Sequence, residues 1–166
     1  MGKRIKIFFA ICIAVFFVFL VVEVVWMINN PEAASLYIES AEQGNAEAQF
    51  QLGLCYKYGG KGLKRNNTKA VKWFLEAAKQ DHVEAQYHLG FAYEYGKGVD
   101  RNDAEAVKWY RSAAKQGHAD AQFHLGLCYA NGKGMEQDNA EAIKWLSKAA
   151  DQGHAEAREA LAHLTH

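Results

Sequence analysis

One nine-residue pattern occurs three times in this chain at a nearly constant spacing. Its copies begin 37 and 36 residues apart, at Ala48, Ala85 and Ala121. A tryptophan recurs downstream of each copy with a spacing of 36, at Trp73, Trp109 and Trp145. Self-similarity at this period predicts a stack of like units in which each unit contacts only its neighbours. Such a stack favours a binding surface over an active site.

Each unit has the pattern of two helices joined by a glycine turn. Ala85, Leu89 and Ala92 fall on one face of a helix expected over 84–95. A glycine recurs within this helix, at Gly53, Gly90 and Gly126, which indicates close backbone contact with the partner helix. The second helix is expected to begin after a polar cap, at Asn66, Asn102 or Asp138. The predicted fold is therefore an all-α solenoid.

Charge and cysteine content exclude several classes of function. The chain balances 19 basic against 19 acidic residues, and no basic stripe indicates nucleic-acid binding. Cys55 and Cys128 occupy one repeat position two units apart, so helix packing distances separate them by roughly 20 Å. A disulfide requires Cα atoms within about 7 Å. We interpret both as buried structural thiols.

The N-terminus has the pattern of a membrane anchor. Residues 7–28 are apolar except for Glu23, and a helix of this length spans about 33 Å, enough for a hydrocarbon core of about 30 Å. The sequence predicts a basic cytoplasmic segment over 1–6, a transmembrane signal anchor over 7–28 and a linker over 29–32. Because basic residues lie only before the apolar run, the remainder is expected outside the cytoplasm, facing the periplasm if the source is bacterial. Secretion after signal cleavage is the alternative.

Residues 33–166 carry four recurring motifs: A-x-x-x-L-G-x-x-Y, a G-x-G turn, A-x-x-W-[FYL]-x-x-A-A and Q-G-[HN]-A-[ED]-A. These motifs resemble those of the Sel-one-like repeat family, relatives of the tetratricopeptide repeats. The resemblance divides the region into a half repeat (33–45), full repeats (46–82, 83–118 and 119–154) and a terminal half repeat (155–166). It implies a right-handed superhelix of helical hairpins that serves as a protein-interaction scaffold. Asp81 departs from the pattern, because Gly44, Gly117 and Gly153 close the other units.

Motifs that could carry chemistry have a structural explanation in each case. Ser112 and Lys115 match the S-x-x-K of penicillin-binding enzymes, but the partner motifs K-T-G and S-D-N are missing from the sequence. Three histidines recur in the turns, at His82, His118 and His154, where stacking of units would hold them too far apart to share a metal. We expected these histidines to be solvated. No catalytic, cofactor-binding or metal site is predicted.

The candidate site is a groove on the first helix of each unit. Phe50, Tyr87 and Phe123 share one repeat position and are predicted to form an exposed aromatic row. Aromatic side chains beside polar groups favour binding of a peptide or protein. Phe91 and Leu127 fit packing between units equally well. The predicted groove residues are Glu47, Phe50, Gln51, Lys57, Tyr58, Tyr87, His88, Glu94, Tyr95, Phe123, His124 and Asn131.

The leading hypothesis is a membrane-anchored, non-enzymatic adaptor with a protein or peptide partner. An envelope enzyme of the β-lactamase or penicillin-binding type is a second hypothesis, which rests on family association alone. Regulation of a secreted enzyme by occlusion is a third, because the same surface would permit it.

Overall fold

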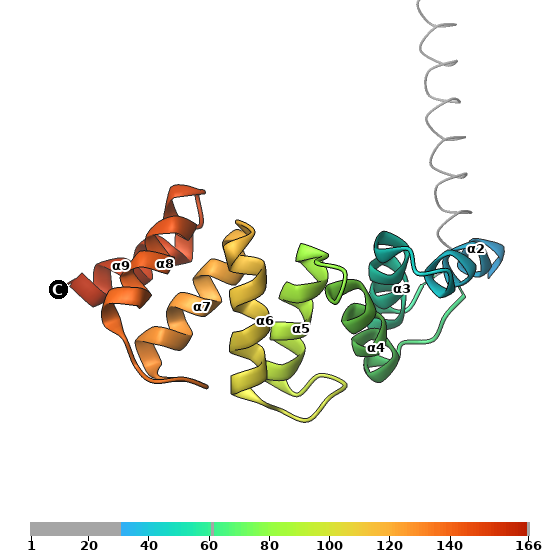
Figure 1. Cartoon of the computed structure of the whole chain (residues 1–166), viewed down its shortest axis with the longest axis horizontal. Coiled ribbons are helices and arrows are strands. Elements are labelled where there is room, and N and C mark those ends of the chain that lie inside the picture. The colour runs from blue at the N-terminus through green and yellow to red at the C-terminus, as the bar shows by residue number, and fades with distance from the viewer. Residues whose placement is uncertain (1–30, 61, 166) are drawn as a thin grey trace, which may run out of the picture.

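The computed structural model describes residues 31–60 and 62–165, which form helices and no β-strand (Figure 1). The predicted anchor over 7–28 lies outside these residues, and no described helix is long and apolar enough to cross a membrane. The helices are α2 (Pro31–Glu42), α3 (Ala46–Tyr58), α4 (Asn67–Ala78), α5 (Val83–Tyr95), α6 (Asp103–Lys115), α7 (Ala119–Asn131), α8 (Asn139–Asp151) and α9 (Ala155–Thr165). Each packs chiefly against the helices before and after it in the chain, which confirms the predicted solenoid.

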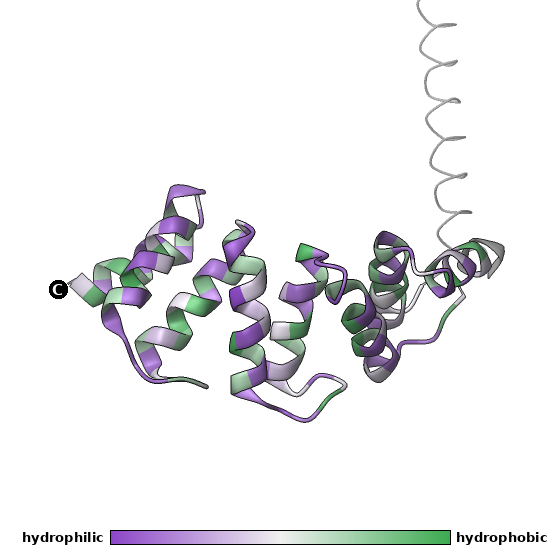
Figure 2. Ribbon diagram, in the orientation of Figure 1, coloured by the Kyte–Doolittle hydropathy of each residue, from purple (hydrophilic) through white to green (hydrophobic). Residues whose placement is uncertain are grey.

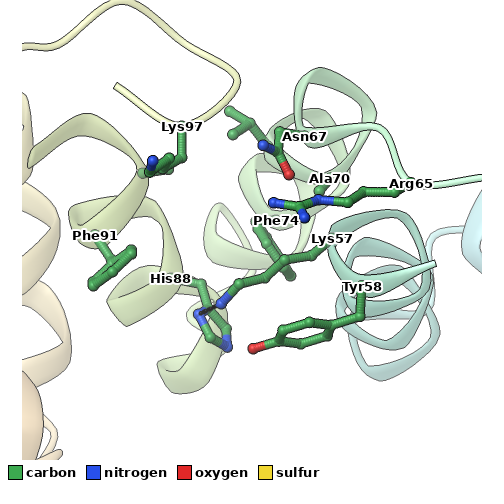
Figure 3. Close-up of a pocket in the computed structure, with 11 residues that line it drawn as sticks. Lys57, Tyr58, Arg65, Asn67, Ala70, Phe74, His88, Phe91 and Lys97 are labelled. Carbon is green, nitrogen blue, oxygen red and sulfur yellow. Dashed lines mark hydrogen bonds between the residues drawn. The ribbon is translucent and has the colours of Figure 1, made fainter. Parts of the chain in front are cut away.

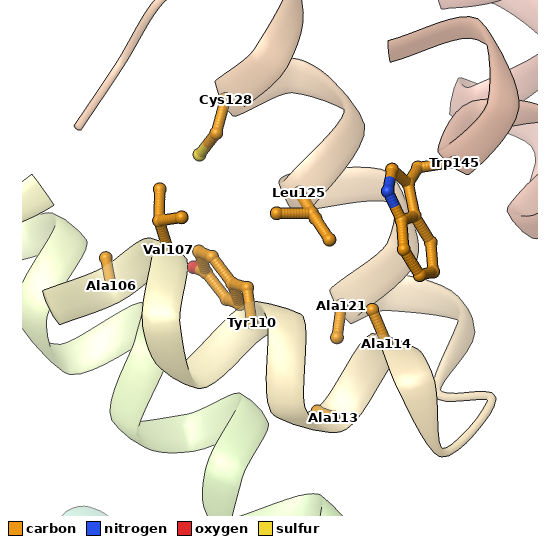
Figure 4. Packing of buried hydrophobic residues seen from close by; sticks show 9 residues of the cluster. All are labelled: Ala106, Val107, Tyr110, Ala113, Ala114, Ala121, Leu125, Cys128 and Trp145. Carbon is orange, nitrogen blue, oxygen red and sulfur yellow. The ribbon is translucent and has the colours of Figure 1, made fainter. Parts of the chain in front are cut away.

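The core is built from small and large side chains that neighbouring helices both contribute. In Figure 4, Val107 and Tyr110 of α6 point toward α7, which carries Leu125 and Cys128. Tyr110 and Leu125 are fully buried.

Burial raises the pKa of the Cys128 thiol to about 12, as expected for an inert structural cysteine. Figure 2 shows that each helix mixes hydrophobic and hydrophilic residues, so no single helix forms the core alone.

The recurring helix glycines are explained by the side chain that faces them. A Cβ at Gly53 or Gly90 would lie 2.5 Å from the ring of Phe74 or Tyr110, and one at Gly126 would lie 2.7 Å from Leu146. The predicted close contact with the partner helix is present, but its nearest atoms are not the backbone atoms that the sequence led us to expect. It is made to a large side chain of the partner helix, which needs the space that a Cβ would fill.

The second helices begin at the predicted caps. The side chains of Asn66, Asn102 and Asp138 accept hydrogen bonds from backbone N–H groups in the first turns of α4, α6 and α8. The N–H of each cap residue donates to the carbonyl of a tyrosine in the preceding helix, at Tyr56, Tyr93 and Tyr129. These bonds tie the two helices of a hairpin together at the cap.

The first helix α3 begins at the ordinary cap Asn45, but the later first helices begin at an unexpected one. The Nδ1 atoms of His82 and His118 accept hydrogen bonds from Ala85 and Ala121 at 3.3 and 3.2 Å, and His154 serves α9 in the same way. The side chains of these three histidines are only 9–15% exposed. The expectation that they are solvated is therefore wrong, because capping and ring stacking hold them between repeats.

The turn before each first helix requires a left-handed residue. Asp81 has a φ of 61°, and among the described residues it is the one non-glycine with positive φ. Gly117 has a φ of 95° at the same repeat position. Asp81 tolerates the conformation as Asp and Asn sometimes do. Its carboxylate also accepts a hydrogen bond from Gln86 at 3.3 Å.

Candidate functional site

The predicted aromatic row is mostly packing between repeats. Each member stacks on the capping histidine of the next unit, with centroid distances of 4.5–4.6 Å: Phe50 on His82, Tyr87 on His118 and Phe123 on His154. Phe50 is only 8% exposed, while Tyr87 and Phe123 are half-buried. The prediction of an exposed row is therefore wrong, because stacking covers these rings.

The polar residues near the row are also committed to neighbouring repeats. The carboxylate of Glu47 accepts a hydrogen bond from Gln51 at 2.7 Å and lies 3.1 Å from Nε2 of His82. Equivalent carboxylate–histidine contacts recur at the later junctions, from Glu84 to His118 and from Asp120 to His154. Glu47 and Gln51 thus support the junction between units, and any contact with a partner would be additional to that role.

Glu94 is buried rather than displayed in the groove. Its carboxylate accepts hydrogen bonds from the Tyr110 hydroxyl at 2.6 Å and the Lys133 ammonium at 2.7 Å, and it lies 3.3 Å from Nδ1 of His124. Burial alone would raise the pKa of Glu94, but the hydrogen bonds from His124, Lys133 and Tyr110 outweigh burial and lower it to about 2. Glu94 and His124 therefore form an internal ion network between the second and third repeats, which corrects their placement in an open groove.

His88 is the residue of the second repeat that corresponds to His124 of the third, but its neighbours are different. Its ring stacks on Phe74 at 5.0 Å, and its Nδ1 lies 3.2 Å from the ammonium of Lys57. Burial, and then the charges of Lys57 and His118, lower the pKa of His88 to about 4. His88 is thus neutral near pH 7, and it accepts one of the hydrogen bonds that Lys57 can donate.

The exposed members of the predicted site lie at the C-terminal ends of the first helices. Tyr58 is 68% exposed and Tyr95 is 49% exposed, and Asn131 is exposed at the same repeat position. Phe91 links the two tyrosines, because its ring lies 4.5 Å from that of Tyr95 and 5.7 Å from the ammonium of Lys57. We name Tyr58, Lys57, Phe91, Tyr95 and Lys133 the tyrosine–lysine strip; Lys57 lies 4.9 Å from the Tyr58 ring and Lys133 lies 5.8 Å from the Tyr95 ring.

A pocket of about 260 Å³ opens beside this strip, between α3, α4 and α5 (Figure 3). Lys57, Tyr58, His88 and Phe91 line it, together with Arg65 before α4 and Lys97 after α5. Arg65 and Lys97 were not among the residues predicted for the groove. The signal was present for Lys97, because lysine occupies the middle of all three glycine turns, at Lys61, Lys97 and Lys133. A signal was also present for Arg65, because arginine recurs before the cap of the next unit at Arg101, although Gln137 takes this position in the third unit.

The arrangement offers aromatic faces and cations to a binding partner. Ser112 donates its hydroxyl hydrogen bond to the carbonyl of Lys108 at 3.2 Å, as a helical serine commonly does. Within residues 31–60 and 62–165, no group of three His, Cys, Asp or Glu side chains could hold a metal ion. Asn66-Asn67-Thr68 matches the N-x-[ST] glycosylation motif, but Asn66 is a helix cap whose side chain accepts a hydrogen bond from the backbone N–H of Lys69 at 2.9 Å.

Comparison with known proteins agrees with this architecture. The family model described as Sel1 repeat matches residues 28–45, 46–82, 83–118 and 119–154. No functionally curated protein matches the chain. A Sel1 repeat protein from Oxalobacter formigenes is 39% identical, with a TM-score of 0.74 over 80% of this chain and 53% of its own.

Two further solved structures share the fold. A protective antigen of uropathogenic Escherichia coli strains, with an SLR fold, is 33% identical, with a TM-score of 0.78 over 81% of this chain and 29% of its own. Cysteine-rich protein B of Helicobacter pylori is 23% identical, with a TM-score of 0.60 over 78% of this chain and 92% of its own. The chain thus spans about a third of the length of the Escherichia coli protein and about half of the length of the Oxalobacter formigenes protein.

Proposed function

Because the chain belongs to the Sel1 repeat family, whose members are generally protein-interaction scaffolds, we propose that it is a non-catalytic adaptor that binds a protein or peptide on the tyrosine–lysine strip. The observation that carries this proposal is the exposure of Tyr58 and Tyr95 on either side of Phe91 and Lys57. Exposed tyrosines present large, rigid contact areas and often dominate the free energy of binding. The strip replaces the buried aromatic row as the candidate docking surface.

The sign of charge on the strip favours an acidic partner. Lys57 and the nearby Arg65 and Lys97 are basic and line one pocket without an acidic residue, whereas Lys133 is paired with the inward-turned carboxylate of Glu94. Complementary charge raises the rate of association and discriminates among partners. The family resemblance also implies a right-handed superhelix, which would place the strip along one continuous side.

The test is crosslinking capture from intact membranes with the full chain and two variants. The double variant Tyr58→Ala, Tyr95→Ala should reduce partner capture by roughly tenfold or more, as expected for loss of interface anchors. Leu36→Ala is the matched control, because Leu36 is also 68% exposed but lies on α2, outside the strip. Undiminished capture by the double variant, or equal loss in the control, would exclude the strip as the binding surface.

We propose further that residues 7–28 anchor this scaffold in a membrane with the repeats outside the cytoplasm. The apolar length of this segment and the basic residues before it support this orientation. A reporter that is active only outside the cytoplasm, fused after His166, should be active. Activity of a reporter that works only in the cytoplasm would reverse the orientation.

A further inference from the structure

The pocket between the first two full repeats concentrates positive charge beside aromatic walls. Lys57, Arg65 and Lys97 line it, and none of its described lining residues is acidic. In Figure 3, Lys57 and Arg65 extend from the side of α3 and α4 toward His88 of α5. In the described part of the chain, none of these three cations forms an ion pair. Lys57 is half-buried and Arg65 and Lys97 are exposed, so all three would attract an anion that enters the pocket, with no lining carboxylate to compete for them.

The next junction contains the same site with an anion in it. The repeat spacing matches Lys57 with Glu94, Asn67 with Asp103, Phe74 with Tyr110, His88 with His124, and Lys97 with Lys133. At that second junction the Glu94 carboxylate lies between Lys133 at 2.7 Å, Tyr110 at 2.6 Å and His124 at 3.3 Å. The chain therefore supplies its own carboxylate to the lysine and histidine of the second junction.

The first junction keeps the lysine and the histidine, as Lys97 and His88. It lacks the two acids, because Lys57 and Asn67 take the positions of Glu94 and Asp103. Lys57 stands where Glu94 would be, and its ammonium lies 3.2 Å from Nδ1 of His88. Phe74 stands where Tyr110 would be, so a carboxylate bound here would rely on the cations without the hydroxyl donor that Glu94 has. The neutral imidazole of His88 takes one donor of Lys57 and leaves the other two free to bind an acceptor.

We propose that this pocket binds a carboxylate of a peptide partner, which takes the place that the Glu94 carboxylate fills one repeat later. The proposal rests on the scaffold function proposed above and names the group that the scaffold recognises. In this complex the carboxylate accepts charge-assisted hydrogen bonds from Lys57, Lys97 and Arg65. Phe74 and Phe91 contact the apolar part of the peptide next to the carboxylate. A volume of about 260 Å³ holds one residue-sized group, so recognition involves a single acidic side chain or a C-terminal residue.

The test uses the full chain in lipid nanodiscs and small carboxylate probes followed by NMR shifts. N-acetylphenylalanine carries a C-terminal-type carboxylate, and N-acetylglutamic acid amide carries a side-chain one. We expect binding in the millimolar range for at least one of them, with shifts at His88 and Phe91, and the tighter probe identifies the source of the carboxylate. N-acetylphenylalanine amide, which lacks the charge, should bind roughly tenfold more weakly or not at all.

Lys57→Glu provides the decisive variant, because it places a carboxylate where Glu94 lies in the next junction. The variant should fold with an unchanged or higher melting temperature and should lose roughly tenfold or more in affinity for the probes. Lys72→Glu makes the same charge change on an exposed site of α4 outside the pocket and should bind as the wild type does. Equal binding of acid and amide, no binding of either acid, or unaltered binding by Lys57→Glu would overturn the proposal.

Two outcomes separate this inference from the scaffold function. If Lys57→Glu loses the probes but captures the membrane partner normally, the scaffold function stands and the pocket is not where that partner binds. If the wild type binds the acids but captures no partner, the scaffold proposal fails and the carboxylate site stands. Preference for inorganic phosphate over both carboxylates would contradict the assignment to a peptide and indicate a phosphate-bearing ligand.

Discussion

Glu94 is the one buried charged residue among those that the structure describes, and its surroundings predict how stability depends on pH. Its pKa is lowered from 4.5 to about 2 by hydrogen bonds from His124, Lys133 and Tyr110, which exceed the opposing effect of burial. A lowered carboxyl pKa adds stability above the unfolded pKa, and this contribution is lost as the pH falls toward the folded pKa. The shift corresponds to about 3 kcal/mol at neutral pH.

Glu94→Gln should therefore lower the free energy of unfolding by about 2–3 kcal/mol at pH 7, and the difference from wild type should shrink by roughly half or more near pH 3. Denaturant unfolding of the full chain at both pH values measures this. Glu105→Gln is the control, because Glu105 pairs with Lys108 on the helix surface at 3.4 Å and such pairs contribute about 0–1 kcal/mol. A gap of the same size at both pH values would mean that Glu94 acts through packing rather than through its charge.

At the scale of the helices, the sequence predicted the hairpins well because their signals are local. The caps Asn66, Asn102 and Asp138 and the turn glycines act within a few residues, so a one-dimensional pattern identifies them. The histidine caps were missed because histidine is an uncommon N-cap residue. Their recurrence every 36 residues was visible, but its meaning depends on contacts between repeats.

Contacts between repeats, which the sequence pattern does not show, also explain the error in the candidate site. Helical periodicity shows which residues avoid the partner helix of the same hairpin, but it does not show what the next hairpin covers. Phe50 packs against His82, and Glu94 is bonded to Lys133 beyond its own hairpin, so contacts with the following repeat complete the burial of both residues. Tyr58 and Tyr95 were predicted correctly as exposed, since they lie at helix ends beyond that contact.

At the scale of the whole molecule, stability is distributed along a line of junctions. Four leucines share one repeat position in α3, α5, α7 and α9: Leu52, Leu89, Leu125 and Leu161. The first three are fully buried, whereas Leu161 is half-buried in α9, which packs mainly on α8 in the described part of the chain. In a linear stack, a unit held from one side opens more easily than one held from both.

Hydrogen exchange should therefore be fastest at Leu161 and slowest at Leu89 and Leu125, although all four are leucines within helices. The comparison is matched, because residue type and repeat position are the same and only the number of packed neighbours differs. We expect the amide of Leu161 to be protected roughly a hundredfold less than that of Leu125, which corresponds to a difference of about 3 kcal/mol in opening free energy. Exchange of the full chain at constant pH, followed by NMR, measures all four sites at once. Equal protection at the four leucines would show that the stack opens only as a whole, and the terminal helix would then be as firmly held as the centre.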